Sequence, residues 1–154
     1  MRNQPAPTDT AAQRAQVPER LLTFHLDSCG YAVRATAVLG VAECGRIRTV
    51  PGAPPEVLGL VEWRGNLLTV LDLPRLLGHV TPVGPACLLR LGPPLQGTAL
   101  FLPAVLRMIA AAPGRLADAQ PGDGLDTIEL EGRRVLVIDP ARLARGGPRE
   151  RPPR

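Results

Sequence analysis

The chain has 154 residues and a net charge of +4, and all 18 of its cationic side chains are arginines. This length is enough for one domain, or for two very small ones, with a sizeable apolar core. Only two Phe, one Tyr and one Trp are present, too few for the aromatic and basic surface of most nucleic-acid-binding proteins, so the composition argues against that class.

The two ends of the chain differ from its middle. Residues 1–19 and 146–154 are rich in Pro, Gly and Arg and offer little apolar surface to bury, so we expect two disordered tails, the second of them basic. Residues 20–145 are then the folded part. The first tail lacks the apolar stretch of a signal peptide, and no apolar run is long enough to span a bilayer, so we expect no direct membrane insertion.

Three cysteines are present, Cys29, Cys44 and Cys87, and none has C-x-x-C spacing. An odd number of cysteines without that spacing predicts neither a disulfide framework nor a structural zinc site. Thiols of this kind fit a reducing compartment, so we expect a cytoplasmic protein.

The first half of the chain has the pattern of a small β unit. Leu22, Phe24 and Leu26 alternate with polar residues and are expected on one buried face of a strand. Further along, two apolar strands are joined by a turn at Arg64-Gly65, where glycine tolerates a positive φ. The predicted strands are 21–27, 31–35, 36–44, 58–63 and 66–72.

The second half repeats the first. Residues 21–77 align with residues 88–144 without a gap, and EWRGNLLTVLDLPRL meets ELEGRRVLVIDPARL. A period this long predicts a duplicated small domain rather than a solenoid. Five short strands in about 60 residues are typical of a small closed barrel. We therefore predict an all-β protein of two tandem five-stranded barrels, at about 20–78 and about 86–145, the second with strands at 86–91, 97–102, 104–110, 126–131 and 133–139.

Each copy ends in an aspartate that follows an apolar strand, Asp72 before LPRLLG and Asp139 before PARLA. Aspartate is a favoured N-cap and Pro140 suits the first helical position, so we predict a short helix after each. A duplicated β unit with one aspartate in each half also fits a bilobal aspartic protease, whose two carboxylates share a proton. Such sites use D-[ST]-G loops, whereas this chain has D-L-P and D-P-A, so the capping interpretation is favoured.

Other catalytic patterns are missing from the sequence. His25 is expected on the outer face of the first strand and His79 follows the helix stop at Gly78, and neither has a partner Cys or Asp at a motif spacing. The glycines form neither a P-loop nor a dinucleotide-binding fingerprint. We therefore expect no enzyme, and no catalytic, cofactor-binding or metal-binding residues.

Several segments together resemble a known family. The stretches LLTFHLDSCGYAV, VLGV and VPGAPPEVLGLVEWRGNLLTVLDLPRLLG resemble the CheW family of chemotaxis coupling proteins. That family's pattern is a strand ending in Gly-x-x-Tyr, then Val-x-Glu-Ile, Pro-x-x-Pro and Gly-Val-x-Asn-Leu-Arg-Gly, and an apolar strand closing in Asp-Leu. The resemblance covers residues 20–145 and is strongest over 51–78.

The resemblance implies two SH3-like barrels, no catalytic site, and a cytoplasmic adaptor in bacterial chemosensory signalling. The implied partners are the regulatory domain of a CheA-type histidine kinase and the cytoplasmic tip of chemoreceptors. The positions that the family uses for these contacts correspond to Val38, Gly59 and Arg64, with Gly65 shaping the turn that carries Arg64. The same residues have simpler interpretations: Val38 and Gly59 pack within strands, and Arg64 is a solvated turn residue.

Four features depart from the family pattern. Gly40 stands where the family has glutamate, and Trp63 replaces a leucine and is expected in the core. Pro103 stands where the second barrel usually has Val-Asp, and the segment 110–126 is shorter than usual. With these departures the fold is still expected, but the identity of the partners is left open. A divergent adaptor in a pilus, gliding or second chemosensory system is an alternative. The alternative from another class is an SH3-like interaction module, for example one that binds nucleic acid, whose affinity would fall steeply with salt.

Overall fold

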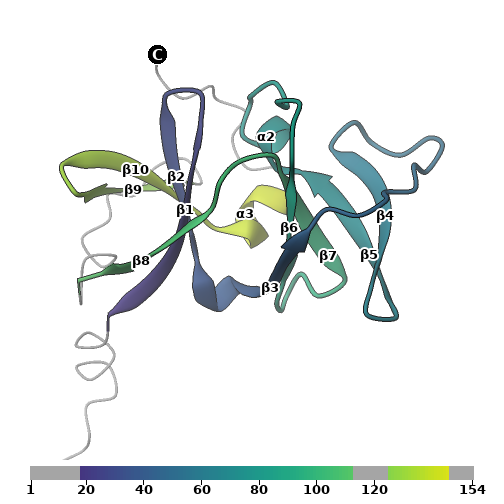
Figure 1. Ribbon diagram of the computed structural model, residues 1–154, viewed down its shortest axis with the longest axis horizontal. Coiled ribbons are helices and arrows are strands. Elements are labelled where there is room, and N and C mark those ends of the chain that lie inside the picture. Colours follow the sequence, from purple (N-terminus) through teal and green to yellow (C-terminus); the bar gives the residue numbers. More distant parts are fainter. Residues whose placement is uncertain (1–17, 113–124, 146–154) are drawn as a thin grey trace, which may run out of the picture.

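The computed structural model describes residues 18–112 and 125–145. Within these ranges the chain forms ten strands and three short helices, and the strands make two five-stranded sheets that lie side by side (Figure 1). The expectation of two disordered tails falls almost entirely on residues 1–17 and 146–154, outside the described residues. The all-β fold class is confirmed.

The first sheet, called sheet A, has the strand order β8-β1-β2-β10-β9. The second, called sheet B, has the order β3-β6-β7-β5-β4. Sheet A consists of β1 Glu19–Leu26, β2 Cys29–Arg34, β8 Arg107–Ala111, β9 Leu125–Leu130 and β10 Arg133–Ile138, and sheet B of β3 Val38–Glu43, β4 Val57–Trp63, β5 Asn66–Asp72, β6 Cys87–Leu91 and β7 Thr98–Leu102; the helices are η1 Ala35–Ala37, α2 Leu73–Leu76 and α3 Pro140–Ala144.

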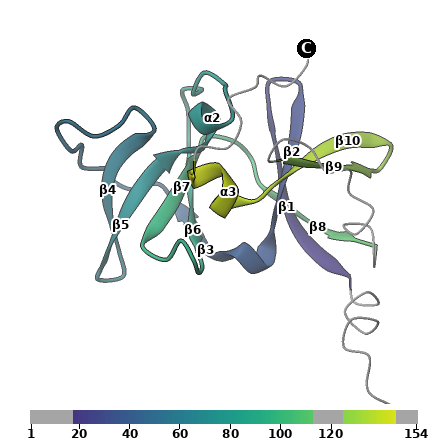
Figure 2. The same cartoon turned by 180° about the vertical axis from the view of Figure 1, so that it is seen from behind.

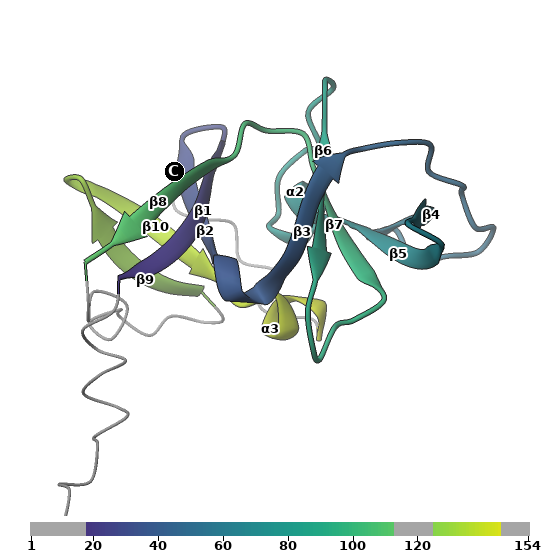
Figure 3. The same ribbon diagram turned by 60° about the horizontal axis from the view of Figure 1, so that its bottom comes forward.

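The sheets do not divide where the repeat predicts. Sheet A takes β1 and β2 from the first half of the chain and β8, β9 and β10 from the second, whereas sheet B takes β3, β4 and β5 from the first half and β6 and β7 from the second. The prediction that 20–78 and 86–145 each form one barrel is therefore wrong for the sheets. The chain crosses from sheet A to sheet B at η1, and returns after β7, as the connection to β8 shows (Figure 3).

The duplication itself is visible in the topology. The repeat relates β1–β2 to β6–β7, β3 to β8, and β4–β5 to β9–β10, and related strands hold the same place in the order of the two sheets. The repeat-related hairpins also turn alike: φ is 48° at Arg64 and 78° at Gly65, and 51° at Glu131 and 76° at Gly132. Two consecutive residues with positive φ form the hairpin turn that matches strand twist.

Apolar side chains form a cluster inside each sheet and a larger one between the sheets. The side chains of Leu22, Phe24 and Leu26 enter the cluster between the sheets, which confirms the alternation predicted for β1. Leu21, one position earlier, joins the cluster of sheet A. Because successive strand residues face opposite sides, a single strand contributes to two cores. Figure 2 shows α2 and α3 lying between the two sheets, where Leu73 and Leu143 join the shared cluster.

Both aspartate caps are confirmed. The backbone N–H of Arg75 donates to Oδ1 of Asp72 at 3.2 Å, and that of Ala141 donates to Oδ1 of Asp139 at 3.0 Å. Each carboxylate thus satisfies an N–H that the first helical turn leaves free. Among the described residues, no helix has the length and apolar character needed to cross a membrane.

Candidate functional site

The four residues expected to bind partners all lie in sheet B. Val38 begins β3, is half-buried and packs against the cluster between the sheets, so part of its role is structural. Gly59 lies within β4, and Arg64 and Gly65 form the turn from β4 to β5. The fold therefore brings them onto one sheet, although only Arg64 faces the groove described below.

Gly59 has a structural reason to be glycine. Its φ is 144°, and a Cβ at this position would overlap the carbonyl oxygen of Arg48. Arg48 approaches because it forms an isolated bridge to Leu60, in which each backbone N–H donates to the other residue's carbonyl at 2.8 Å. This bridge joins the segment after β3 to β4, the other edge of sheet B. Sheet B is thus partly closed into a barrel, and Gly59 permits that closure.

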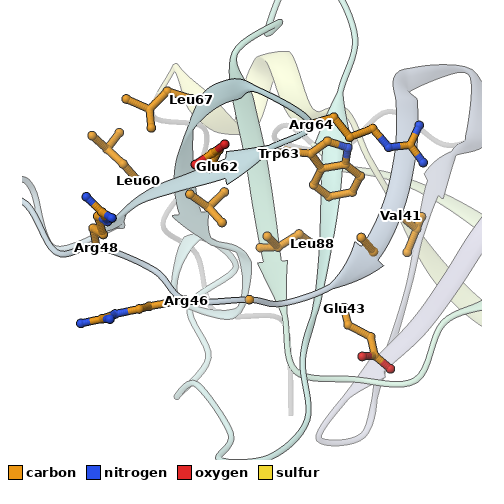
Figure 4. Close-up of a pocket in the computed structure, with 13 residues that line it drawn as sticks. Val41, Glu43, Arg46, Arg48, Leu60, Glu62, Trp63, Arg64, Leu67 and Leu88 are labelled. Carbon is orange, nitrogen blue, oxygen red and sulfur yellow. The ribbon is translucent and has the colours of Figure 1, made fainter.

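Beyond the bridge the two edges separate and leave an open groove of about 580 Å³, called the β3–β4 groove (Figure 4). One wall is β3 and the segment that follows it, and the other is β4 with its turn. Its floor comes from the apolar cluster of sheet B. The lining residues are Val41, Ala42, Glu43, Gly45, Arg46, Arg48, Leu60, Val61, Glu62, Trp63, Arg64, Leu67 and Leu88.

The groove combines exposed apolar side chains with arginines. Val41 is 48% exposed and Leu67 65% exposed, and both line the same groove, so they form part of an exposed apolar patch rather than isolated surface residues. Trp63 packs partly against the cluster of sheet B and also lines the groove, so the core assignment from sequence is confirmed only in part. Apolar and cationic groups on one concave surface are typical of a protein-binding site.

The sequence named Arg64 and Trp63 but missed the rest of this surface. Arg46 and Arg48 lie in the segment after β3, where the chain is in no strand apart from the bridge at Arg48. The sequence pattern of this segment gave no signal for a site. Val41 and Leu67 were expected only as parts of strands, because an apolar residue in a strand is usually buried.

Away from the groove, a polar cluster connects the two sheets. Nε2 of His79 lies 2.6 Å from the hydroxyl of Tyr31, and Nδ1 lies 2.9 Å from Oδ2 of Asp27. Tyr31 is 1% exposed and the His79 side chain 8% exposed, and burial raises the pKa of the Tyr31 phenol well above its usual range. The phenol is therefore a buried hydrogen-bonding group rather than a nucleophile. His79, which the sequence left without a partner, has a structural role.

The buried carboxylate of Asp72 also has a structural role. Oδ2 of the buried Asp72 accepts a 2.6 Å hydrogen bond from the Thr81 hydroxyl, so both of its oxygens are used within the fold. Cys44 and Cys87 are unpaired thiols whose pKa is raised by burial. Within the ranges 18–112 and 125–145, no group of three or more His, Cys, Asp or Glu side chains is placed to hold a metal ion.

Comparisons with known proteins agree with this architecture. The family profile of the CheW-like domain matches residues 20–146. Fifteen solved chains match the structure. One is the scaffolding protein TtCheW from Thermoanaerobacter tengcongensis, with a TM-score of 0.72 and 17% sequence identity over 82% of this chain and 92% of that chain. No curated protein matches the sequence.

The structural likeness establishes the fold, and the profile covers nearly all of the folded residues. The match spans both sheets, both capped helices and the groove beside Arg64. The chain belongs to the CheW-like domain family.

Proposed function

We propose that this protein is a non-enzymatic adaptor that couples chemoreceptors to a CheA-type histidine kinase in a bacterial chemosensory array. It acts in the cytoplasm, beside membrane-anchored receptors. The observation that carries this proposal is the family match over residues 20–146, together with an exposed apolar and cationic surface on sheet B. A scaffold needs such surfaces and needs no reacting groups.

The chemistry of the described residues supports a binding role. The hydrogen-bonded side chains Asp27, His79 and Tyr31 include a phenol that is buried in the contact between the two sheets. Asp72 and Asp139 cap separate helices. The groove, in contrast, is open and has no acid–base pair joined by a hydrogen bond.

The proposed contacts lie on sheet B. Arg64 touches the partner directly from the tip of the β4–β5 turn, where its guanidinium offers several donors to a carboxylate or a carbonyl. Gly65 supplies the positive φ of that turn, Gly59 allows the barrel to close beneath it, and Val38 sets the position of β3.

A pull-down from a lysate of the source organism tests the proposal. The tagged chain is expected to retain a CheA-type kinase and chemoreceptors, identified by mass spectrometry. Retention of nucleic acid instead, with an affinity that falls steeply between low and physiological salt, would favour the nucleic-acid-binding alternative. Retention of neither partner after washing at low salt would remove the support for the adaptor role.

A further inference from the structure

The β3–β4 groove is a gap in an incompletely closed barrel. β3 and β4 are the two edge strands of sheet B, and the Arg48–Leu60 bridge joins these edges at one end. At the other end the Trp63 ring reaches across from β4 to β3, where a Cβ at Gly40 would lie 3.3 Å from its Cζ2 atom. Between these two points the edges are apart, as Figure 4 shows.

Both edges present backbone groups to this gap. Leu60 uses its N–H and C=O toward Arg48, and strand residues two apart point their backbone groups the same way, so those of Glu62 face the groove. Directly after β3, the backbone N–H of Cys44 donates to the carbonyl of Ala86, the residue before β6. The backbone groups of Glu43, one position earlier, therefore face away from β6 and toward the groove. Within the described residues, no backbone hydrogen bond crosses the groove beyond the bridge.

The side chains of the groove define what would fit. Trp63, Leu88 and Val61 make an apolar floor and wall. Arg46 and Arg48 lie together at one end, and Figure 4 places Glu43 at the other. Over the described ranges, no salt bridge joins these two arginines to a carboxylate of the protein itself. Their charges are thus available to a ligand.

Gly40 and Trp63 are a matched pair. With glycine at position 40 the indole can lie against β3, whereas any side chain there would press on the ring at a distance tighter than ordinary van der Waals contact. An aromatic wall therefore replaces the glutamate and leucine that the family pattern would put at these positions. This change removes an acidic group, and the charged side chains that still line the groove have a net positive charge, which favours an acidic rather than a basic ligand. They are Arg46, Arg48, Arg64, Glu43 and Glu62.

We propose that the β3–β4 groove binds an extended acidic segment of a partner protein, which adds along the free edge of β4 at Glu62. One apolar side chain of the segment lies on the floor beside Trp63. Its neighbours in sequence point outward, where their carboxylates meet Arg46 and Arg48. The inference deepens the proposed function, on which it rests in taking the partner to be a protein, and it makes Gly40 and Trp63 residues that determine partner specificity.

Trp63, the only tryptophan of the chain, supplies the readout. The full chain is titrated with a capped peptide of sequence Ser-Glu-Val-Glu-Val-Glu-Ser, and the intrinsic fluorescence is recorded. We expect a saturable change, and binding at least about tenfold weaker for the peptide with Lys in place of Glu, since charge-assisted hydrogen bonds are lost. A peptide N-methylated at the central Glu should bind at least about fivefold more weakly, because N-methylation removes a backbone donor from strand pairing.

Variants locate the site. The double variant Arg46→Glu and Arg48→Glu should bind the acidic peptide at least about tenfold more weakly. Arg107→Glu, an exposed arginine on β8 of sheet A, is the matched control and should leave binding unchanged. Gly40→Val, with its fold checked by thermal melting, should weaken binding by moving the indole.

Equal binding of the Glu and Lys peptides, or no saturable fluorescence change with either, overturns the proposal, and this comparison needs no variant to fold. Its failure is separable from that of the adaptor role. If the chain retains the kinase in the pull-down but does not bind the peptide, the groove proposal alone is wrong. If it binds the peptide but retains no kinase, the adaptor role alone is wrong.

Discussion

The hydroxyl of Tyr31 lies 2.6 Å from Nε2 of His79, although 48 residues separate them in the sequence. Tyr31 is in β2 of sheet A, and His79 follows α2 at the end of the β4–β5 hairpin of sheet B. A neutral imidazole that donates from Nδ1 to Asp27 and accepts at Nε2 from the phenol satisfies all three groups. This chain of hydrogen bonds is a polar link between the two sheets, set in an otherwise apolar contact.

A double-mutant cycle measures that link. His79→Leu removes the imidazole that accepts from the buried phenol hydroxyl and should cost about 1–3 kcal/mol of unfolding free energy. Tyr31→Phe should cost about 0.5–1.5 kcal/mol, and the double variant less than the sum, with a coupling of at least about 0.5 kcal/mol. Urea unfolding provides the values, and His25→Leu, on the exposed side of β1, is the control. Strictly additive effects would mean that the hydrogen bond adds nothing to stability.

Alkaline pH should weaken the fold through the same tyrosine. Burial raises the pKa of the Tyr31 phenol in the folded state above the value of 10.0 expected when it is unfolded. The stability that the protonated Tyr31 phenol gives to the fold is fully present below pH 10. It is lost as pH rises from 10 through the folded pKa, because in that range the unfolded chain releases the proton and the folded chain keeps it. Stability should fall by up to about 1.4 kcal/mol per pH unit above pH 10. Tyr31 is the only tyrosine, so phenolate absorbance reports it directly. Ionisation near pH 10 without unfolding would contradict this assignment.

The two capping aspartates provide a matched comparison. Asp139→Ala removes a cap alone and should cost about 0.5–2 kcal/mol. Asp72→Ala removes the equivalent cap and also the hydrogen bond from Thr81, so it should cost about 1 kcal/mol more. Asp72→Asn should be nearly neutral, because an amide oxygen still accepts from Arg75. Thermal melts of the three variants test the order. If Asp72→Asn melts like wild type but loses partner binding, the carboxylate has a role beyond capping.

Arg64→Glu tests the proposed contact at the β4–β5 turn. We expect binding to the kinase regulatory domain or to the receptor tip to weaken by more than about 1.5 kcal/mol, through loss of a charge-assisted hydrogen bond. Folding should change by no more than about 0.5 kcal/mol, since the side chain is exposed. Glu131→Arg is the control: the repeat places Glu131 at the same turn position with nearly the same φ, but in sheet A. Unchanged affinity of Arg64→Glu for both partners would leave Arg64 a solvated turn residue.

Much of the fold could be predicted from local pattern. The β4–β5 and β9–β10 hairpins follow from apolar strands around a two-residue turn ending in glycine, and both helices follow from an aspartate cap. These signals act over a few residues, where the backbone allows few conformations. Two strand starts were wrong: the strand expected at 104–110 begins at Arg107, four residues after Pro103, and the strand expected at 36–44 begins at Val38, after η1.

The exchange of strands between the two halves could not be predicted in the same way. The alternation in β3 and β8 says that one face is buried, but not which strand lies beside them. Each could pair with its own half or with the other. The structure pairs β3 with β6 and β8 with β1, which buries the cluster between the sheets.

The candidate site was only partly accessible from the sequence. Arg64 was named because the family resemblance gives a contact at its position, and its place at a predicted turn made an exposed side chain expected. Val41 and Leu67 line the gap between the edges of sheet B, and the Arg48–Leu60 bridge closes that gap at one end. The role of Gly40 likewise emerges only when Trp63 is placed beside it. Both depend on contacts between segments distant in sequence.

The central claim, that this chain couples receptors to a kinase, is tested most directly by reconstitution. The CheA-type kinase of the source organism is mixed with receptor signalling fragments held on vesicles, and its autophosphorylation is followed with and without the chain. We predict that kinase activity and kinase recovery in the vesicle pellet both rise only when the chain is present, and that Arg64→Glu reduces both while Glu131→Arg does not. Equal activity and recovery with and without the wild-type chain would contradict the account.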